Sequence, residues 1–151
     1  MSRPREHLSP IFSIVVGIMG YSAKAVAKGK ILVVEDEEEY RLLLKTVLGE
    51  AGYEVFATGT GKEGLRLFAA HAPDLILLDV MLPDMVGFDF CRKIRAGDVA
   101  PETPVLFCTV RSAVSSLARG AREGAADYVI KPFVVPDLLA RVRVALGGAA
   151  A

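Results

Sequence analysis

The strongest constraint on the fold is a fivefold alternation between short apolar runs and segments with helical periodicity. From Lys30 onward, no apolar run reaches the roughly 18 residues that a membrane-spanning helix requires. The apolar runs predict strands at residues 31–34, 53–57, 74–78, 104–108 and 127–130. The periodic segments predict helices near residues 37–51, 60–71, 86–96, 112–123 and 136–146. Alternation at this spacing favours parallel strands joined by right-handed helical crossovers.

The first helical segment shows this periodicity clearly. Its apolar side chains are expected to form one stripe, made of Tyr40, Leu43, Leu44, Val47 and Leu48. Gly52 follows as a helix stop signal. The first, third and fourth strands are continuous apolar runs, as burial on both faces of a sheet requires. The sequence therefore predicts an α/β fold with a five-stranded, doubly wound parallel sheet and helices on both faces.

Composition excludes several classes of protein. A chain of 151 residues is about the size of one domain, and 52% hydrophobic content supports a packed core rather than disorder. Lys and Arg together number 18, as do Asp and Glu, so the formal net charge is zero. Without a basic field, we expect no nucleic-acid partner. Cys91 and Cys108 have no C-x-x-C spacing and no neighbouring histidine pair, which predicts buried free thiols in a reducing compartment.

Residues 1–29 differ from the rest of the chain. Arg3 and Arg5 precede an apolar run at residues 11–21, and Ala25-Val26-Ala27 follows, which is the outline of a secretory signal. As a helix the run would cover about 17 Å of a hydrocarbon core roughly 30 Å thick, too little to span a bilayer. We interpret the segment as an extension that packs on the domain or derives from an upstream start codon. Targeting or membrane contact is the alternative.

Polar residues stand at the carboxyl ends of four predicted strands. Glu35 and Asp36 follow the first strand, Asp79 the third and Thr109 the fourth, and the fifth runs directly into Lys131. In a doubly wound sheet, ligands bind beyond the carboxyl ends of the strands. These side chains are therefore expected to converge in space.

Three converging carboxylates need a counter-charge, since otherwise at least one of them would bind a proton. Mg²⁺ prefers oxygen ligands, so Glu35, Asp36 and Asp79 suit it, and the lack of histidine or cysteine argues against zinc. One aspartate could then attack phosphorus to form an acyl phosphate, with Lys131 stabilising the charge and Thr109 donating a hydrogen bond. The glutamates at positions 37–39 are interpreted as a solvated helix start.

These segments closely resemble the receiver domain of two-component response regulators over residues 30–146. The matching motifs, in order, are ILVVEDEEE, DLILLDVMLPDMVGFDFCRKIR, PVLFCTV and DYVIKPF. The resemblance implies a flavodoxin-like sheet with strand order 2-1-3-4-5. It also implies that Asp79 is the phosphoacceptor, that Asp36 and Asp79 bind Mg²⁺ directly, and that Glu35 acts largely through water. The Met81 backbone carbonyl would add a ligand, Lys131 would pair with the phosphoryl group, and the Lys131–Pro132 peptide bond would be cis.

The resemblance further implies a conformational switch. Thr109 would move toward the phosphoryl oxygens, and Tyr128 would rotate into the space it leaves, which would change a surface made by the fourth helix, fifth strand and fifth helix. Val110 departs from the family, which usually has a very small residue there, so we expect slower phosphotransfer or autodephosphorylation. Met81 and Arg111 occupy positions where the family tunes the phosphoryl lifetime.

Other functions fit the sequence less well. Residues 59–64 match G-x-G-x-x-G, but a dinucleotide fold places that loop after its first strand. An aspartate-nucleophile phosphatase would need a second aspartate where this chain has Met81. A pseudo-receiver acting only as an interaction module is the main alternative, although every acidic, threonine and lysine position is present. His7 and His71 do not suit a catalytic triad.

The sequence thus predicts a receiver domain at residues 30–147, flanked by the extension at 1–29 and a tail at 148–151. We expect a single-domain signalling phosphoacceptor that assists its own phosphotransfer and autodephosphorylation, rather than an enzyme acting on a separate substrate. Its expected partners are a sensor histidine kinase or phosphotransfer protein and a downstream protein target. Neither nucleic acid nor membrane is an expected partner, and the expected location is the cytoplasm.

Overall fold

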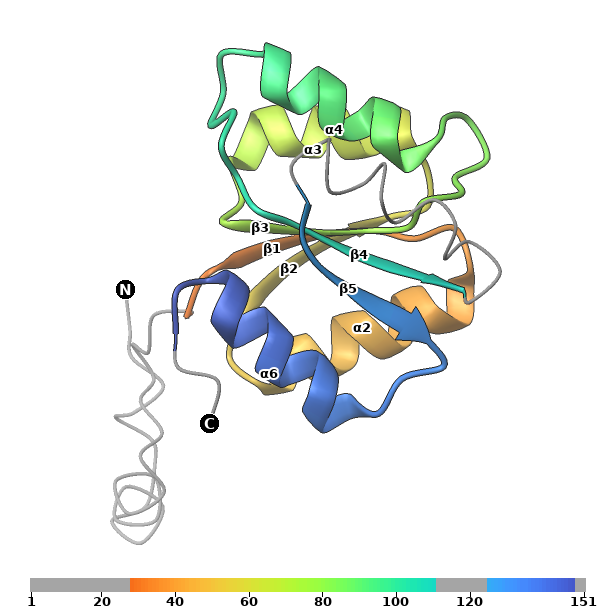
Figure 1. Cartoon of the computed structure of the whole chain (residues 1–151), viewed down its shortest axis with the longest axis vertical. Helices are drawn as coiled ribbons and strands as arrows, with labels where there is room; N and C mark the ends of the chain where they lie inside the picture. The colour runs from red at the N-terminus through yellow and green to blue at the C-terminus, as the bar shows by residue number, and fades with distance from the viewer. Residues whose placement is uncertain (1–27, 111–124, 149–151) are drawn as a thin grey trace, which may run out of the picture.

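Strands and helices alternate along the chain as the apolar pattern predicts (Figure 1). The computed structural model describes residues 28–110 and 125–148. The strands are β1 (Lys30–Val34), β2 (Glu54–Thr58), β3 (Leu75–Leu78), β4 (Val105–Val110) and β5 (Ala125–Lys131). The helices are α2 (Glu38–Glu50), α3 (Gly61–His71), α4 (Gly87–Ala96) and α6 (Val135–Ala145). The helix predicted at 112–123 and most of the extension at 1–29 lie outside the described residues.

The five strands form one parallel sheet in the order β2-β1-β3-β4-β5, which confirms the predicted fold class and strand order. Val34, the last residue of β1, pairs with Leu78, the last residue of β3. The residues that follow β1 and β3 therefore begin side by side, at the same height along the strand direction. β4 and β5 extend further than predicted, so that Thr109 and Lys131 lie within the strands rather than beyond them.

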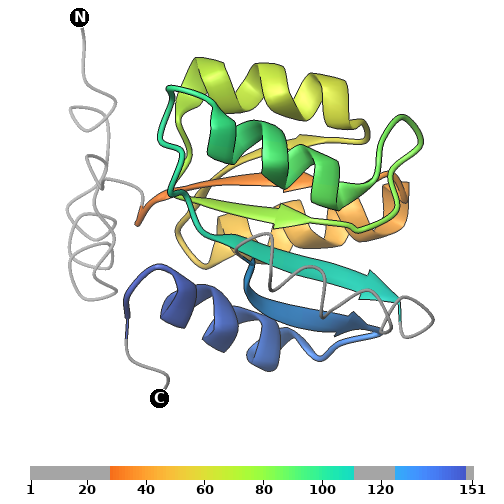
Figure 2. The same ribbon diagram turned by 45° about the horizontal axis from the view of Figure 1, so that its top comes forward.

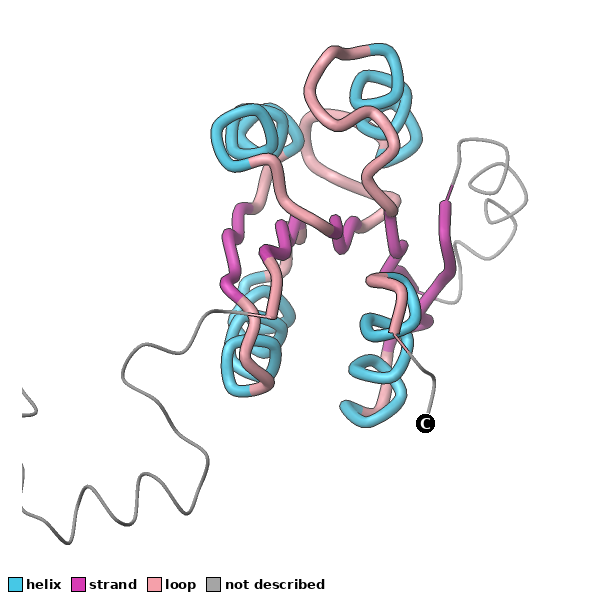
Figure 3. The backbone as a smooth tube through the Cα atoms, turned by 90° about the vertical axis from the view of Figure 1, so that its left-hand side faces the viewer, coloured by secondary structure: helices cyan, strands magenta, loops and turns pink. Residues whose placement is uncertain are grey.

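Helices cover both faces of the sheet, α2 and α6 on one and α3 and α4 on the other (Figures 1 and 3). The strand residues alternate between the two resulting cores, as a pleated strand requires. On β1, Ile31 and Val33 pack in the first core, whereas Leu32 and Val34 pack in the second. All four of these side chains are fully buried. The double-sided burial explains why the central strands are continuous apolar runs.

The apolar stripe of α2 is narrower than predicted. Leu44 and Leu48 are buried against the sheet, whereas Leu43, a member of the predicted stripe, is 39% exposed. Leu43 stands at the margin of the stripe, and the helix buries only a narrow face against β1 and β2. Gly52 does end the segment, with a positive φ of 104° that favours glycine.

The start of β1 and the end of α6 lie on the side of the sheet where the strands begin (Figure 2). The Lys28 amide donates to the Gly52 carbonyl at 2.9 Å. One small cavity at this edge, of about 200 Å³, is lined by Lys28, Tyr53, Arg143, Leu146 and Gly148. No helix among the described residues is long and apolar enough to cross a membrane.

Candidate functional site

The polar residues predicted to converge do meet at the carboxyl edge of the sheet. The register of β1 and β3 extends past their ends, because the Asp79 amide donates to the Val34 carbonyl at 3.1 Å. This contact holds Asp79 beside the acidic pair that follows β1. Carboxylate oxygens of Glu35, Asp36 and Asp79 all lie within 4.8 Å of one another.

Asp79 occupies the centre of this cluster and is only 7% exposed. Its Oδ1 accepts hydrogen bonds from the Met81 amide at 3.1 Å and from the Thr109 hydroxyl at 3.2 Å. Its Oδ2 lies 3.1 Å from Lys131 Nζ. A carboxylate, a hydroxyl and an ammonium from three different strand ends are therefore in direct contact.

Lys131 supplies the positive charge at the site and is 4% exposed. Its Nζ lies 2.6 Å from Glu35 Oε1 and 4.5 Å from the ring centroid of Tyr40. Burial alone would lower the pKa of Lys131, but the contacts with Glu35 and Asp79 outweigh it and hold the pKa above its ordinary value. The lysine is thus charged and shared among the carboxylates. The Lys131–Pro132 peptide bond is cis, as the resemblance implies.

Glu35 is the most deeply buried carboxylate of the cluster, at 1% exposure. Its Oε2 accepts from the Glu37 amide at 3.0 Å. Burial raises its pKa, and the hydrogen bonds to Lys131 and to the Glu37 amide only partly offset this effect. A buried carboxylate beside two further carboxylates offers the oxygen ligands that a hard divalent cation such as Mg²⁺ prefers.

Two contributors to the site were not predicted. Glu37 is exposed at the N-cap of α2, as a solvated helix start predicts, but its Oε1 also lies 3.2 Å from Lys131 Nζ, a contact that was not predicted. Glu38 and Glu39 are exposed in the first turn of α2, as predicted. Arg41 donates from Nη1 to the carbonyls of Glu35 at 2.8 Å and Asp36 at 3.2 Å, which fixes the backbone of the acidic pair.

The residues assigned to the switch lie beside this site. The Thr109 hydroxyl is fully buried and already points at Asp79. The Tyr128 ring is half-buried and lies parallel to Phe107, with 6.4 Å between ring centroids. Val110 is 42% exposed at the end of β4. Arg111 lies outside the described residues.

The glycine-rich segment at 59–64 forms the entry to α3. The Thr60 hydroxyl caps the helix by accepting from the Glu63 amide at 3.2 Å. The Gly61 and Lys62 amides donate to the Asp84 carboxylate, each at 2.8 Å. The amides that a dinucleotide phosphate would need are therefore engaged by the chain itself, which argues against that function.

A doubly wound parallel sheet with an acidic cluster, a threonine and a lysine at its carboxyl edge defines the receiver class of signalling domain. The family model described as the response regulator receiver domain matches residues 31–143. The chain therefore belongs to this family of two-component signalling switches.

Particular relatives support the same assignment. The chain is 44% identical over 119 residues to the uncharacterized transcriptional regulatory protein YkoG of Bacillus subtilis, covering 79% of this chain and 51% of that protein. It is 41% identical over 117 residues to the phosphate regulon transcriptional regulatory protein PhoB of Rhizobium meliloti, covering 78% of this chain and 52% of that protein. The chain thus spans about half the length of these curated relatives.

Solved structures agree with the fold. The non-phosphorylated HemR receiver domain of Leptospira biflexa matches with a TM-score of 0.71 at 34% identity, over 79% of this chain and 94% of that one. A response regulator receiver domain protein from Clostridium thermocellum matches with a TM-score of 0.73 at 29% identity, over 81% of this chain and 95% of that one.

Proposed function

We propose that this receiver domain accepts a phosphoryl group on Asp79. The donor would be the phosphohistidine of a sensor histidine kinase or phosphotransfer protein, with small acyl phosphates as alternative donors. One observation supports this above all: the carboxylate of Asp79 is largely buried, yet it contacts the Thr109 hydroxyl and the Lys131 ammonium directly. Two further carboxylates adjoin it.

The acidic cluster would hold Mg²⁺. Asp36 and Asp79 would bind it directly, Glu35 largely through water, and the Met81 backbone carbonyl would add a further oxygen. When bound, Mg²⁺ neutralises the carboxylates and stabilises charge on the phosphoryl oxygens. All these groups are hard oxygen donors of the kind that Mg²⁺ prefers.

In the proposed reaction, a carboxylate oxygen of Asp79 attacks phosphorus. A phosphorus–oxygen bond forms while the phosphorus–nitrogen bond breaks, and the imidazole of the donor leaves with the electron pair. Lys131 lies beside Asp79 and would stabilise the negative charge on the transferred group. The Thr109 hydroxyl would donate to a phosphoryl oxygen. Attack by water on the acyl phosphate would later restore the carboxylate and release inorganic phosphate.

The phosphorylated domain would signal through its surface. A shift of Thr109 and rotation of Tyr128 would change the surface of β5 and α6, which a downstream protein would bind. The helix predicted at 112–123, the third part of the predicted switch surface, lies outside the described residues. We place this exchange in residues 30–147 and in the cytoplasm, where ATP-charged kinases work. The proposed exchange requires neither nucleic acid nor a membrane.

Mass spectrometry after incubation with acetyl phosphate and Mg²⁺ tests the proposal. The wild-type protein should gain the mass of one phosphoryl group, and Asp79→Asn should not. The gain should be lost on treatment with hydroxylamine, which cleaves acyl phosphates. An unchanged wild-type mass would contradict the proposal and favour the pseudo-receiver, and an equal gain in Asp79→Asn would point to a different acceptor.

A further inference from the structure

The loop between β3 and α4 is attached to the start of a different helix, α3. Its residue Asp84 accepts from the Gly61 amide through Oδ1 and from the Lys62 amide through Oδ2, both at 2.8 Å. These amides belong to the first turn of α3, where backbone donors have no partner within the helix. The two hydrogen bonds lower the pKa of Asp84. A side chain more than twenty positions away therefore completes the cap that Thr60 begins.

The neighbouring residue, Met85, packs against the same helix end. An ideal Cβ placed on Gly61 would lie 2.5 Å from Met85 Cγ and 2.6 Å from Met85 Sδ, closer than real Cβ atoms approach. Only glycine leaves room for the methionine in this position. Two successive loop residues thus hold one end of α3, one by hydrogen bonds and one by packing.

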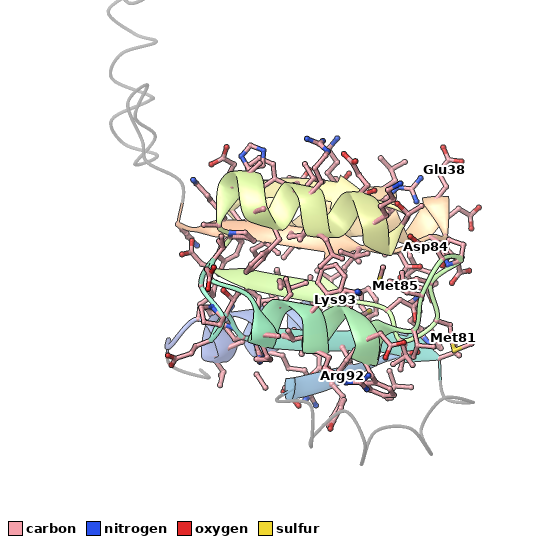
Figure 4. All side chains as sticks on the ribbon, turned by 90° about the horizontal axis from the view of Figure 1, so that it is seen from above. Glu38, Met81, Asp84, Met85, Arg92 and Lys93 are labelled. Carbon is pink, nitrogen blue, oxygen red and sulfur yellow. The ribbon has the colours of Figure 1, made fainter. Side chains whose placement is uncertain are left out.

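The same loop begins at the acidic site with Met81, and Figure 4 labels Met81, Asp84 and Met85 along it. The Met81 amide donates to Asp79, and Met81 forms an isolated antiparallel bridge with Val86. The Leu82 amide donates to the Met85 carbonyl at 3.2 Å, which closes the loop between them. Because the loop is closed in this way, fixing Asp84 and Met85 also restricts Met81.

We propose that Asp84 is a positioning residue for the cation site. By capping α3, it fixes the loop so that the Met81 backbone carbonyl is already in place before a divalent cation binds. The inference rests on the proposed function, since it takes that carbonyl as a ligand. A loop ordered beforehand loses less entropy when the cation binds, so loss of the cap should weaken binding. Residues that orient metal ligands affect affinity by roughly tenfold or more.

Isothermal titration calorimetry with Mg²⁺ tests this role. Asp84→Ala should raise the Kd for Mg²⁺ about tenfold. Thr60→Ala is the matched control, because it removes a cap hydrogen bond from the same helix without touching the loop between β3 and α4. Both variants should lose similar stability to urea, but only Asp84→Ala should lose affinity for Mg²⁺. An unchanged Kd in Asp84→Ala, or an equal rise in Thr60→Ala, would overturn the proposal.

A second variant separates positioning from the loss of a negative charge. Gly61→Ala leaves the charge unchanged and favours helix, but its Cβ displaces Met85 from the helix end. It should also weaken Mg²⁺ binding, and wild-type affinity in this variant would show that Asp84 acts only through its charge.

Hydrogen exchange of the backbone amides at residues 80–82 and 84–86 provides a readout that needs no metal. In EDTA these amides should exchange faster in Asp84→Ala than in wild type, and equal rates would contradict the inference. If wild type binds Mg²⁺ and is phosphorylated normally, and Asp84→Ala behaves in the same way, only the positioning role of Asp84 is ruled out. If wild type neither binds Mg²⁺ nor is phosphorylated, the proposed function is overturned together with the positioning role.

Discussion

Replacing Lys131 by methionine should destabilise the metal-free protein by about 3 kcal/mol at pH 7. Methionine keeps the aliphatic stem of the lysine but removes the ammonium that lies 2.6 Å from Glu35 and 3.1 Å from Asp79. Both carboxylates are buried, so each would be left without its counter-charge. Removing one partner of a buried ion pair typically costs about 3–5 kcal/mol.

The ability of Glu35 to take up a proton limits this cost. Its ordinary pKa is about 4.3, so holding it neutral at pH 7 costs at most about 3.7 kcal/mol, at 1.36 kcal/mol per pH unit. At pH 5 the same limit is about 1 kcal/mol. Burial already raises the pKa of Glu35, and loss of Lys131 raises it further. A carboxyl group with a raised pKa in the folded state binds more protons there than when unfolded, so the variant should regain stability as the pH falls from 7 to 5.

Urea unfolding followed by circular dichroism in EDTA measures the effect at both pH values. Lys45→Met is the control, because it removes one charge from an exposed position on α2 and should change stability by less than about 0.5 kcal/mol. A loss below 1 kcal/mol for Lys131→Met at pH 7 would refute the reasoning. So would a loss of equal size at pH 5 and pH 7.

Four further predictions follow from single positions. Val134→Ser should raise the free energy of unfolding by about 1 kcal/mol in urea, because the N-cap residue of α6 is a 67% exposed valine that forms no side-chain cap hydrogen bond. Gly87→Ala should lower it by about 2–3 kcal/mol, since a Cβ there would lie 2.5 Å from the Asp79 carbonyl oxygen; an equally stable variant would contradict this contact. Burial raises the pKa of the Cys108 thiol to about 12, so iodoacetamide at pH 8 should alkylate it only after unfolding, as mass spectrometry would show. Val110→Ala should speed loss of the phosphoryl group from phosphorylated protein, and similar half-lives in both proteins would refute a role for Val110.

The sheet and the centre of the site were predictable because both follow from local patterns. Continuous apolar runs identify buried parallel strands, and the carboxyl ends of such strands share one edge. That rule was enough to bring Asp79, Thr109 and Lys131 together, although they lie far apart in the sequence. Their contacts in the structure agree with it.

The supporting contacts were not predictable, because no local pattern specifies them. Glu37 looks like any acidic residue at a helix start, and only the position of Lys131, 94 residues away, brings it into the site. Asp84 follows a proline and has the sequence character of a turn residue. Its role as a cap depends on how closely the loop approaches α3, which the packing of the two helices determines. Leu43 shows the same limit, because periodicity identifies an apolar face but not how much of it the neighbouring strands cover.

The closeness of Lys28 and Gly148 also bears on circular permutation. A short linker could join these two positions, since both border the same small cavity. New ends could then be opened in the exposed turn at residues 97–100, where the chain returns to begin β4. The acidic cluster would be retained in such a rearranged chain, because it depends on which strands are neighbours in space and not on the order in which the ribosome makes them.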